Sequence, residues 1–258
     1  MDNYRYTKDS INPERSFEAA RINKYLSDAG MCSRREADRL ICEGKVLVDG
    51  QTAVMGQKVF PWQKVVCNGK EILSDDELTV IAFNKPVGVE CTTDKSNPCN
   101  IVDYINYPSR IFPIGRLDKN SSGLILLTNT GILSEKILRG SNNHEKEYAV
   151  TVDHKITPEF VNRMETGVKI TLEDGRKSAV TKPCAVKKTG NCSFRIILTQ
   201  GLNRQIRRMC LASGYKVISL KRIRIMNIKL DDLAEGSYRK LSSEELEELL
   251  SELGLLKG

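Results

Sequence analysis

The stretch FPIGRLDKNSSGLILLTNTG, residues 112–131, holds a single carboxylate between two cations. Asp118 follows Arg116 by two residues and directly precedes Lys119, in a turn that leads into an apolar run typical of a β-strand. Bond-breaking sites usually pair two carboxylates or couple a nucleophile to a base, yet this stretch offers no second acid and no histidine. Asp118 therefore indicates either chemistry that needs one ionised acid or a side chain that caps a turn.

The composition is that of an ordinary globular protein. The chain has 258 residues, 40% hydrophobic and 28% charged, which suits one large domain or a large and a small one. No apolar run approaches the roughly 18 residues of a membrane helix, and the polar N-terminal stretch does not resemble a secretory signal. We therefore expect a cytoplasmic protein with no membrane partner.

Cysteine and histidine usage gives little support for a metal or cofactor site. The eight cysteines are scattered without a C-x-x-C pair, and there are only two histidines. Reduced thiols in a cytosolic protein are the expected reading. Because the glycine-rich nucleotide motifs are also missing, we expect no cofactor and no metal.

The basic residues concentrate late in the chain. The formal net charge is +7, and the segment 201–229 holds eight Lys or Arg and no acid. We expect a helix from Gly201 to about Ser213, with Arg204, Arg207 and Arg208 crowded on its outer face. Either an anionic group, such as RNA phosphate or a buried carboxylate, opposes these arginines, or the face is simply solvated. If the helix meets Asp118, that acid should remain ionised.

The N-terminal part predicts a small unit over residues 17–74, preceded by a flexible tail over residues 1–16. Two short amphipathic helices are expected, the second opened by the capping-box pair Ser33 and Glu36. A hairpin with Asp49-Gly50 at its turn follows. On the second helix Arg34, Arg35 and Arg39 lie away from the apolar stripe, either as a solvated face partly neutralised by nearby acids or as a phosphate-binding surface.

Residues 75–258 predict a second, larger domain, joined to the first at the polar break Ser74–Leu78. Strand-like runs rich in β-branched residues alternate irregularly with helical ones, which favours an α+β domain with a mixed or antiparallel sheet. An amphipathic acidic helix, Ser242–Leu253, should be capped by Ser242 and Glu245 and pack on this domain.

Several of these segments resemble known families. SRREADRLI (33–41) and the following glycine–valine pattern resemble the S4 domain, an RNA-binding module. The GRLD segment, HEKEYAVTVD (144–153) and LTQGLNRQIRRMC (198–210) resemble, in order, the three signature segments of the RsuA family of pseudouridine synthases, S4-bearing enzymes that act on ribosomal RNA. Within that family the chain is most similar to the RluF branch, through NHEKEY and RIRIMNIKL.

The resemblance implies roles for individual residues. Asp118 matches the catalytic aspartate, Tyr148 the tyrosine that packs on the target base, and Arg207 the basic residue that pairs with the aspartate. Arg116 matches the arginine that helps hold the uridine out of its stack. Contacts to RNA are expected from the remaining basic residues of the motifs, Lys85, Lys146, Arg204, Arg208, Arg34, Arg35 and Arg39.

Some of these positions also have a purely structural interpretation. The sequence around Tyr148 is equally typical of an ordinary core tyrosine, and Lys146 is either a phosphate contact or a solvated lysine. Thr130 stands where the family text has an acid, at a helix start where threonine also caps.

The implied reaction converts uridine to pseudouridine in structured RNA. The N1–C1′ bond breaks, the uracil turns, and C5 forms the new bond; nothing is hydrolysed, so one ionised aspartate can suffice. The branch points to large-subunit (23S) ribosomal RNA as substrate, with tRNA as a second candidate, and a monomer is expected. The alternatives are a non-catalytic S4 RNA-binding assembly factor and a hydrolase that would need a second acid.

Overall fold

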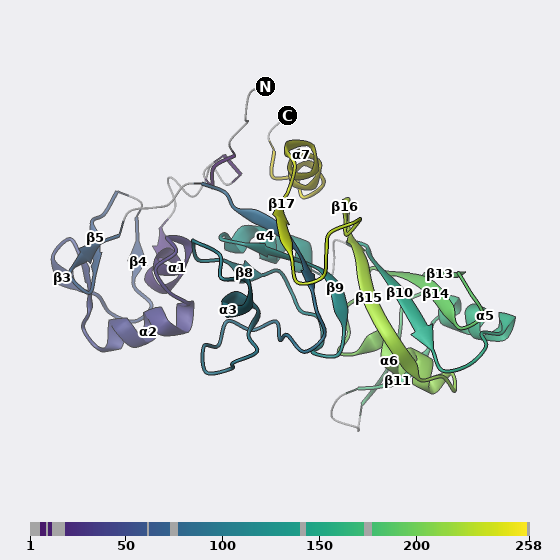
Figure 1. The fold of residues 1–258 in the computed structure, drawn as a ribbon. Helices are drawn as coiled ribbons and strands as arrows, with labels where there is room; N and C mark the ends of the chain where they lie inside the picture. The colour runs from purple at the N-terminus through teal and green to yellow at the C-terminus, as the bar shows by residue number, and fades with distance from the viewer. Residues whose placement is uncertain are drawn as a thin grey trace.

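The computed structural model describes residues 6–8, 10–11, 19–60, 62–72, 77–139, 143–172 and 177–256. A small N-terminal unit lies beside a larger domain built on one long sheet (Figure 1). The sheet extends from β7 and β17 near the centre of the view to β13 and β14 at the right, and α7 lies at the top near both chain ends. The predicted α+β class is confirmed, because helices pack on a mixed sheet.

The small unit has its own core. Ile22 and Leu26 of α1 and Leu40 of α2 are buried against the strands that follow. Its helices and strands are β1 (Ala20–Arg21), α1 (Ile22–Asp28), α2 (Arg34–Cys42), β2 (Val46–Val48), β3 (Gln51–Thr52), β4 (Lys58–Val59), β5 (Val65–Cys67) and β6 (Lys70–Glu71). Strands pair in the order β3-β2-β5-β6, and β1 pairs separately with β4.

Local signals in this unit correspond to the geometry observed. The Ser33 hydroxyl accepts a hydrogen bond from the Glu36 backbone N–H at the start of α2. Asp49 and Gly50 both have positive φ, 50° and 82°, as a tight hairpin turn of type I′ requires. The predicted cap and the predicted turn are therefore confirmed.

The large sheet contains nine strands in the order β13-β14-β10-β15-β9-β7-β17, with β16 beside β15 and β8 beside β9. The β9–β15 pair is parallel and the other pairs among the described strands are antiparallel. The strands are β7 (Val80–Lys85), β8 (Phe112–Pro113), β9 (Ser122–Thr128), β10 (Lys146–Val152), β13 (Ala185–Lys188), β14 (Ser193–Leu198), β15 (Val217–Ile225), β16 (Ile228–Lys229) and β17 (Tyr238–Lys240). β11 (Lys169–Thr171) and β12 (Ser178–Val180) form a separate pair.

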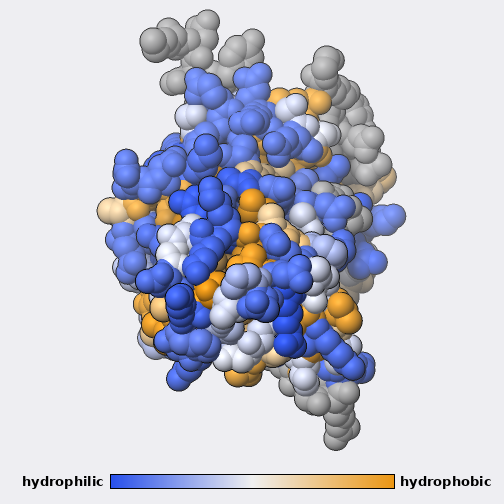
Figure 2. Space-filling model, turned by 90° about the vertical axis from the view of Figure 1, so that its right-hand side faces the viewer, coloured by the Kyte–Doolittle hydropathy of each residue, from blue (hydrophilic) through white to orange (hydrophobic). Residues whose placement is uncertain are grey.

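Helices cover both faces of this sheet. Alternation along β7 sends Val80 and Ala82 to a core shared with α4 and α7, and Ile81 and Phe83 to a core shared with α3. α5 and α6 pack on the other end of the sheet around Phe194. The helices are α3 (Ile101–Ile105), α4 (Gly131–Leu138), α5 (Pro158–Thr166), α6 (Gln205–Ala212) and α7 (Ser243–Glu252). Figure 2 shows the right-hand end of the molecule as mainly hydrophilic, with smaller hydrophobic areas.

The C-terminal helix follows the prediction closely. Ser242 and Glu245 form the complete capping box at the start of α7. Leu249 and Leu250 are fully buried in the core beneath it. At α4 the expectation holds only in part, because Thr130 occupies the N-cap position but its side chain makes no capping hydrogen bond.

Part of the segment expected to be a loose tail is packed. Thr7 bridges to Glu77, and Ile11 is 2% exposed in the core shared with α4 and α7. Lys8 and Ile11 are therefore buried within the segment predicted to be a flexible tail, a position that the polar sequence around Ile11 does not reveal, and the flexibility of this segment stays a prediction. The remainder of the predicted tail, and the predicted boundary at residues 74–75, lie outside the described residues.

Two cations from outside the small unit, Arg110 of the large domain and Lys8 of the N-terminal segment, contact the end of α1. The last turn of α1 leaves backbone carbonyls without helical partners. Arg110 Nη1 donates to Ser27 O over 2.9 Å, and Lys8 Nζ donates to Asp28 O over 3.0 Å. Positive charge at a helix C-terminus also complements its dipole, so these contacts help hold the small unit against the segments that surround it.

Candidate active site

Asp118 lines a cavity of about 460 Å³ between loops of the large domain. The turn that carries it is firmly held from both sides. Leu117 N–H donates to Cys91 Sγ over 3.2 Å, Ser121 N–H donates to Asp118 O over 3.0 Å, and Gly88 N–H donates to Lys119 O over 2.9 Å. The lining residues are Glu90, Cys91, Thr92, Asn97, Arg116, Leu117, Asp118, Lys119 and Arg204.

A second acid, which the sequence reasoning missed, lies in this cavity. Glu90 Oε1 pairs with Lys119 Nζ over 2.8 Å, and Glu90 Oε2 accepts from Asn97 Nδ2 over 3.0 Å. The hydrogen bond from Lys119 holds the pKa of Glu90 below its usual range. Lys119 is thereby engaged by Glu90, so that Arg116 and Arg204 are the lining cations without an ion pair in the described part of the chain.

Arg204 reaches the cavity through an unusual backbone conformation. The helix expected from Gly201 begins at Gln205, and Arg204 is its N-cap in the left-handed region, with φ 50° and ψ 34°. Of the three arginines expected on one helical face, Arg204 precedes the helix and lines the cavity, whereas Arg207 and Arg208 lie within the helix and do not line it. Residues other than glycine adopt this conformation at a cost of about 1–2 kcal/mol, and such strain often accompanies functional positions.

Arg207 lies at the turn of Asp118 without pairing directly with its carboxylate. Its Nη2 donates to Asn120 O over 2.6 Å and to Ser121 Oγ over 3.3 Å. Its Nε is buried without a hydrogen-bond partner among the described residues. Burial lowers the pKa of Arg207, as does Arg204, while the Asp118 charge acts in the opposite direction. An ion pair between Arg207 and Asp118 was expected; in the structure the Arg207 guanidinium instead holds the turn that follows Asp118 through hydrogen bonds.

Arg208 points elsewhere. Its Nη2 donates to Asn203 Oδ1 over 2.9 Å, and its Nη1 is buried without a hydrogen-bond partner in the part of the chain that the structure describes. It is not among the residues that line the Asp118 cavity.

Behind the Asp118 turn, four strands place Lys85, Gly123, Arg222 and Tyr148 in one cross-strand row. Lys85 is opposite Gly123, Gly123 opposite Arg222, and Arg222 opposite Tyr148. A Cβ on Gly123 would come within 2.2 Å of Arg222 O, so glycine is needed for this close approach. Tyr148 is half-buried and packs between the cores at the two ends of the sheet.

Lys85 is a buried lysine rather than a surface contact. Its side chain is 0% exposed, and Nζ donates to Pro86 O and Val89 O over 2.7 and 2.8 Å. Burial lowers the pKa of Lys85, although Cys91 and then Asp118 oppose the shift. The predicted direct contact with RNA does not fit this position, because the ammonium group is enclosed by protein and serves to hold the loop beside Asp118.

Arg222 is another site residue that the sequence did not single out, because it stands in a strand crowded with lysines and arginines. It is 3% exposed, and its Nε donates to Leu124 O over 2.7 Å. Its Nη2 has no hydrogen-bond partner among the described residues.

Lys146, a predicted RNA contact, is half-buried near Arg222. Burial and the charge of Arg222 lower the pKa of Lys146, and its Nζ donates to His144 O over 3.3 Å.

The arginines of α2 lie on the surface of the small unit. Arg34 and Arg35 are exposed. Arg39 is also exposed, but it forms ion pairs with both Glu36 and Glu43. The structure thus leaves Arg34 and Arg35 more available to an anionic partner than Arg39.

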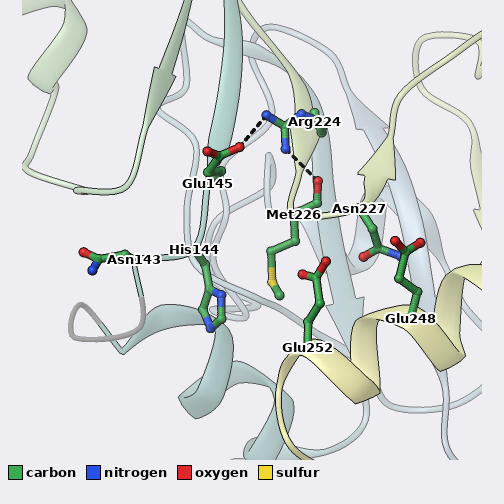
Figure 3. Close-up of a pocket in the computed structure, with 8 residues that line it drawn as sticks. All are labelled: Asn143, His144, Glu145, Arg224, Met226, Asn227, Glu248 and Glu252. Atoms are coloured by element: carbon green, nitrogen blue, oxygen red, sulfur yellow. Dashed lines mark hydrogen bonds and ion pairs between the residues drawn. The ribbon is translucent and has the colours of Figure 1, made fainter. Parts of the chain in front are cut away.

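A separate cavity of about 280 Å³ lies where the start of β10, the β15–β16 turn and α7 meet (Figure 3). None of the predicted site residues lines it. Arg224 crosses its edge, pairing with Glu145 and donating to Met226 O (Figure 3). Burial lowers the pKa of His144, whose Nε2 has no hydrogen-bond partner in the described structure.

Comparison with known proteins decides the chemistry. Residues 79–212 match the family model for RNA pseudouridylate synthase, and residues 20–54 match the S4 domain. The chain belongs to the RNA pseudouridylate synthase family. It is an isomerase that converts uridine to pseudouridine in RNA, as the sequence resemblance predicted. The residues that line the Asp118 cavity lie within the matched synthase segment, as does Tyr148, whereas Arg222 lies beyond its end.

Individual relatives agree with this assignment. The dual-specificity RNA pseudouridine synthase RluF of Salmonella typhi is 52% identical over 233 residues, covering 90% of this chain and 78% of the relative. RluF of Escherichia coli K12 is 51% identical over the same coverage. An uncharacterised RNA pseudouridine synthase of Mycobacterium leprae is 35% identical over 250 residues, covering 94% and 96%. A crystal structure of a pseudouridylate synthase aligns with TM-score 0.64 at 27% identity, over 89% of this chain and 99% of that one.

Two structural observations bear on partners. Among the described residues no helix has the length and hydrophobicity needed to cross a membrane. Within the same residues, no three His, Cys, Asp or Glu side chains gather as a metal site would require.

Proposed function

We propose that this synthase modifies one or a few uridines of large-subunit (23S) ribosomal RNA, with Asp118 as the catalytic aspartate. The relatives of about half-identical sequence carry the name dual-specificity RNA pseudouridine synthase. A second RNA target, with tRNA as the candidate, is therefore part of the proposal. The observation that carries it is the position of Asp118 at a hydrogen-bonded turn, in a cavity that also holds Arg116 and Arg204, which have no ion pair among the described residues.

The reaction needs the base to leave its stack, since its C5 and N1 are otherwise enclosed. Arg116, exposed beside Asp118, fits the role of holding the nucleotide out of the helix. Tyr148, on the row behind the turn, fits the role of packing on the uracil ring and helping to remove the C5 proton. Arg207 would support the turn from beneath through Asn120 and Ser121.

The chemistry balances without an added group. The N1–C1′ bond breaks and a C5–C1′ bond forms; C5 loses a proton and N1 gains one, so composition and oxidation state are unchanged. The Asp118 carboxylate would act on the sugar or the base while ionised. Exposed cations, Arg116 and Arg204 here and Arg34 and Arg35 on α2, would meet phosphate groups.

The properties of the second acid, Glu90, argue against the alternative that the protein is a hydrolase. A hydrolytic pair requires one carboxylic acid kept protonated near neutral pH. Glu90 has a lowered pKa because Lys119 donates to it, so it remains an anion. Its place is better explained as the anchor that keeps Lys119 away from Asp118.

The decisive experiment maps pseudouridine across ribosomal RNA and tRNA in cells that lack the gene. Cells are complemented with wild type, with Asp118→Asn, or with Asp232→Asn, an exposed aspartate outside the cavity. We expect wild type and Asp232→Asn to restore the lost sites, and Asp118→Asn to reduce turnover by at least about a thousandfold while still binding RNA. Restoration by Asp118→Asn would exclude its catalytic role; sites confined to tRNA would exclude the ribosomal substrate.

Two further properties belong to the proposal. We expect the enzyme to act as a monomer in the cytoplasm, where its RNA substrates are found. Light scattering at several concentrations tests the first, and fractionation tests the second.

A further inference from the structure

An exposed aromatic pair on the small unit has no role in the active site. Trp62, the only tryptophan of the chain, is 69% exposed, and Phe60 is 40% exposed. Their rings stack, with centroids 4.7 Å apart and planes inclined by 18°. A scattered exposed apolar residue needs no explanation, but a stacked aromatic pair with this much exposed ring surface offers a ring on which a further planar partner can stack.

The turn that presents the two rings is held in place. Gln63 N–H donates to Phe60 O, and Phe60 N–H donates to Gln63 Oε1 over 3.0 Å. Gln63 Nε2 and Lys64 N–H in turn donate to the carboxylate of Asp49, in the neighbouring hairpin turn, over 2.7 and 2.9 Å. The rings are thus displayed on a preorganised turn, which lowers the entropic cost of binding to them.

The charge around the pair favours a nucleic acid over a protein or membrane partner. Residues 19–72 contain nine Lys or Arg and six Asp or Glu. Lys58 and Lys64 flank the pair in sequence and are exposed, and Lys58 makes no ion pair among the described residues. An aromatic surface flanked by cations is the arrangement with which proteins hold unpaired bases, the rings stacking and the cations meeting phosphate.

We propose that Trp62 and Phe60 form a stacking platform for an unpaired base of the substrate RNA, outside the catalytic cavity. This inference rests on the proposed function only in taking structured RNA as the partner. The platform lies beyond the segment 20–54 that matches the S4 domain. It would let the small unit select RNAs that present an unpaired base in a loop or bulge, the form in which RNA sequence is most readily recognised.

The first test uses selectively excited tryptophan fluorescence, which comes from Trp62 alone because it is the only tryptophan of the chain. Full-length Asp118→Asn protein is titrated with a short single-stranded RNA and with the blunt duplex of the same sequence. We expect saturable quenching with the single strand and little with the duplex. Equal quenching by both, or binding of the single strand without any change in fluorescence, would overturn the proposal.

The second test uses variants in the otherwise unchanged enzyme. Trp62→Ala should raise KM for the natural RNA about tenfold, since one stacked base typically contributes this much, while kcat at saturating RNA stays at the wild-type value. Trp62→Tyr should recover most of the loss. Met55→Ala, at a residue 53% exposed on the preceding turn and outside the stacked pair, is the matched control and should change nothing.

The outcomes separate this proposal from the proposed function. Wild-type turnover of ribosomal uridines with an unaffected Trp62→Ala variant would overturn the platform and leave the enzymatic assignment intact. Quenching by unpaired RNA in a protein with no ribosomal target would support the platform and overturn the proposed ribosomal substrate. A loss in Trp62→Ala that Met55→Ala reproduces would show that the effect does not depend on the aromatic ring and would overturn the base-stacking role.

Discussion

Helices α2 and α6 each carry arginines and both were predicted to face RNA, yet they are built differently. On α2 the acids Glu36 and Glu43 stand three and four residues from Arg39 and pair with it on the surface. α6 itself contains no acid, and Arg207 makes no ion pair among the described residues; it donates instead to the backbone of the Asp118 turn and is partly buried. The spacing of acids, more than the number of arginines, separates a solvated surface from a site component.

The two helices also start differently. Ser33 caps α2 with its hydroxyl, whereas Arg204 precedes α6 in a left-handed conformation and makes no side-chain cap. The regular start belongs to the helix on the surface, and the strained start belongs to the helix at the cavity. This is the distribution expected where a site imposes its geometry on the backbone.

The largest expected difference between the two helices is in the rate at which their cysteines are alkylated. Burial raises the pKa of Cys210 on α6 to about 12, whereas Cys42 on α2 is exposed. At pH 8 a pKa of about 12 leaves roughly one thiolate in ten thousand molecules, and the thiolate is the reactive form. Alkylation followed by mass spectrometry should modify Cys42 at least about a thousandfold faster than Cys210. Equal rates would mean that α6 opens readily; in denaturant both should react alike.

Arg207→Ala should reduce kcat by about a hundredfold, because it removes a charged donor beneath the catalytic turn. Arg39→Ala should change the same constant by less than about twofold, because exposed ion pairs contribute little. Single-turnover kinetics on the mapped RNA measures both. If the two substitutions have equal effects, the contrast between a site arginine and a surface arginine fails.

Arg204→Asn should relieve strain at the start of α6, since asparagine adopts the left-handed conformation more easily than arginine. We expect unfolding free energy to rise by about 0.5–1 kcal/mol, measured by denaturant titration, and KM for RNA to rise several-fold because a cavity cation is lost. A fall in stability would show that Arg204 is held by contacts rather than strained. Arg208→Asn, at a position with helical geometry, is the control and should not stabilise.

The smallest effect is expected when the acids of α2 are neutralised. Glu36→Gln with Glu43→Gln frees Arg39 and should tighten RNA binding a few-fold, with a steeper salt dependence. Hydrogen bonds from Arg39 and Lys45 keep the pKa values of Glu36 and Glu43 low, so both remain ionised until the pH falls below those lowered values. RNA binding by the wild-type protein should therefore tighten in the same way only at acid pH, where Glu36 and Glu43 are protonated. Glu247→Gln, an exposed change on α7, controls for total charge.

Much of the local structure was predictable because it depends on neighbours in sequence. The capping pairs Ser33–Glu36 and Ser242–Glu245 act within one turn of helix, and Asp49-Gly50 needs only its own backbone freedom. The same holds for the motif around Asp118, whose pattern placed the acid at the head of β9 before any contact was known.

What the sequence could not provide depends on contacts between distant segments. Glu90 lies 29 residues from Lys119, and no local pattern marks it as the partner. In the sequence, Lys85 and Arg222 cannot be told from surface cations. In the folded protein, strand pairing places both opposite Gly123, where they are buried.

The sequence by itself determined the fold class, the family and the identity of the motif residues, because periodicity, caps and turn residues are local and the signature segments are contiguous. The tertiary structure alone decided which arginine is neutralised, which lysine is buried, and which acid meets Asp118 in one cavity. Charge interactions depend on distance and on exclusion of water, and both are properties of the folded chain.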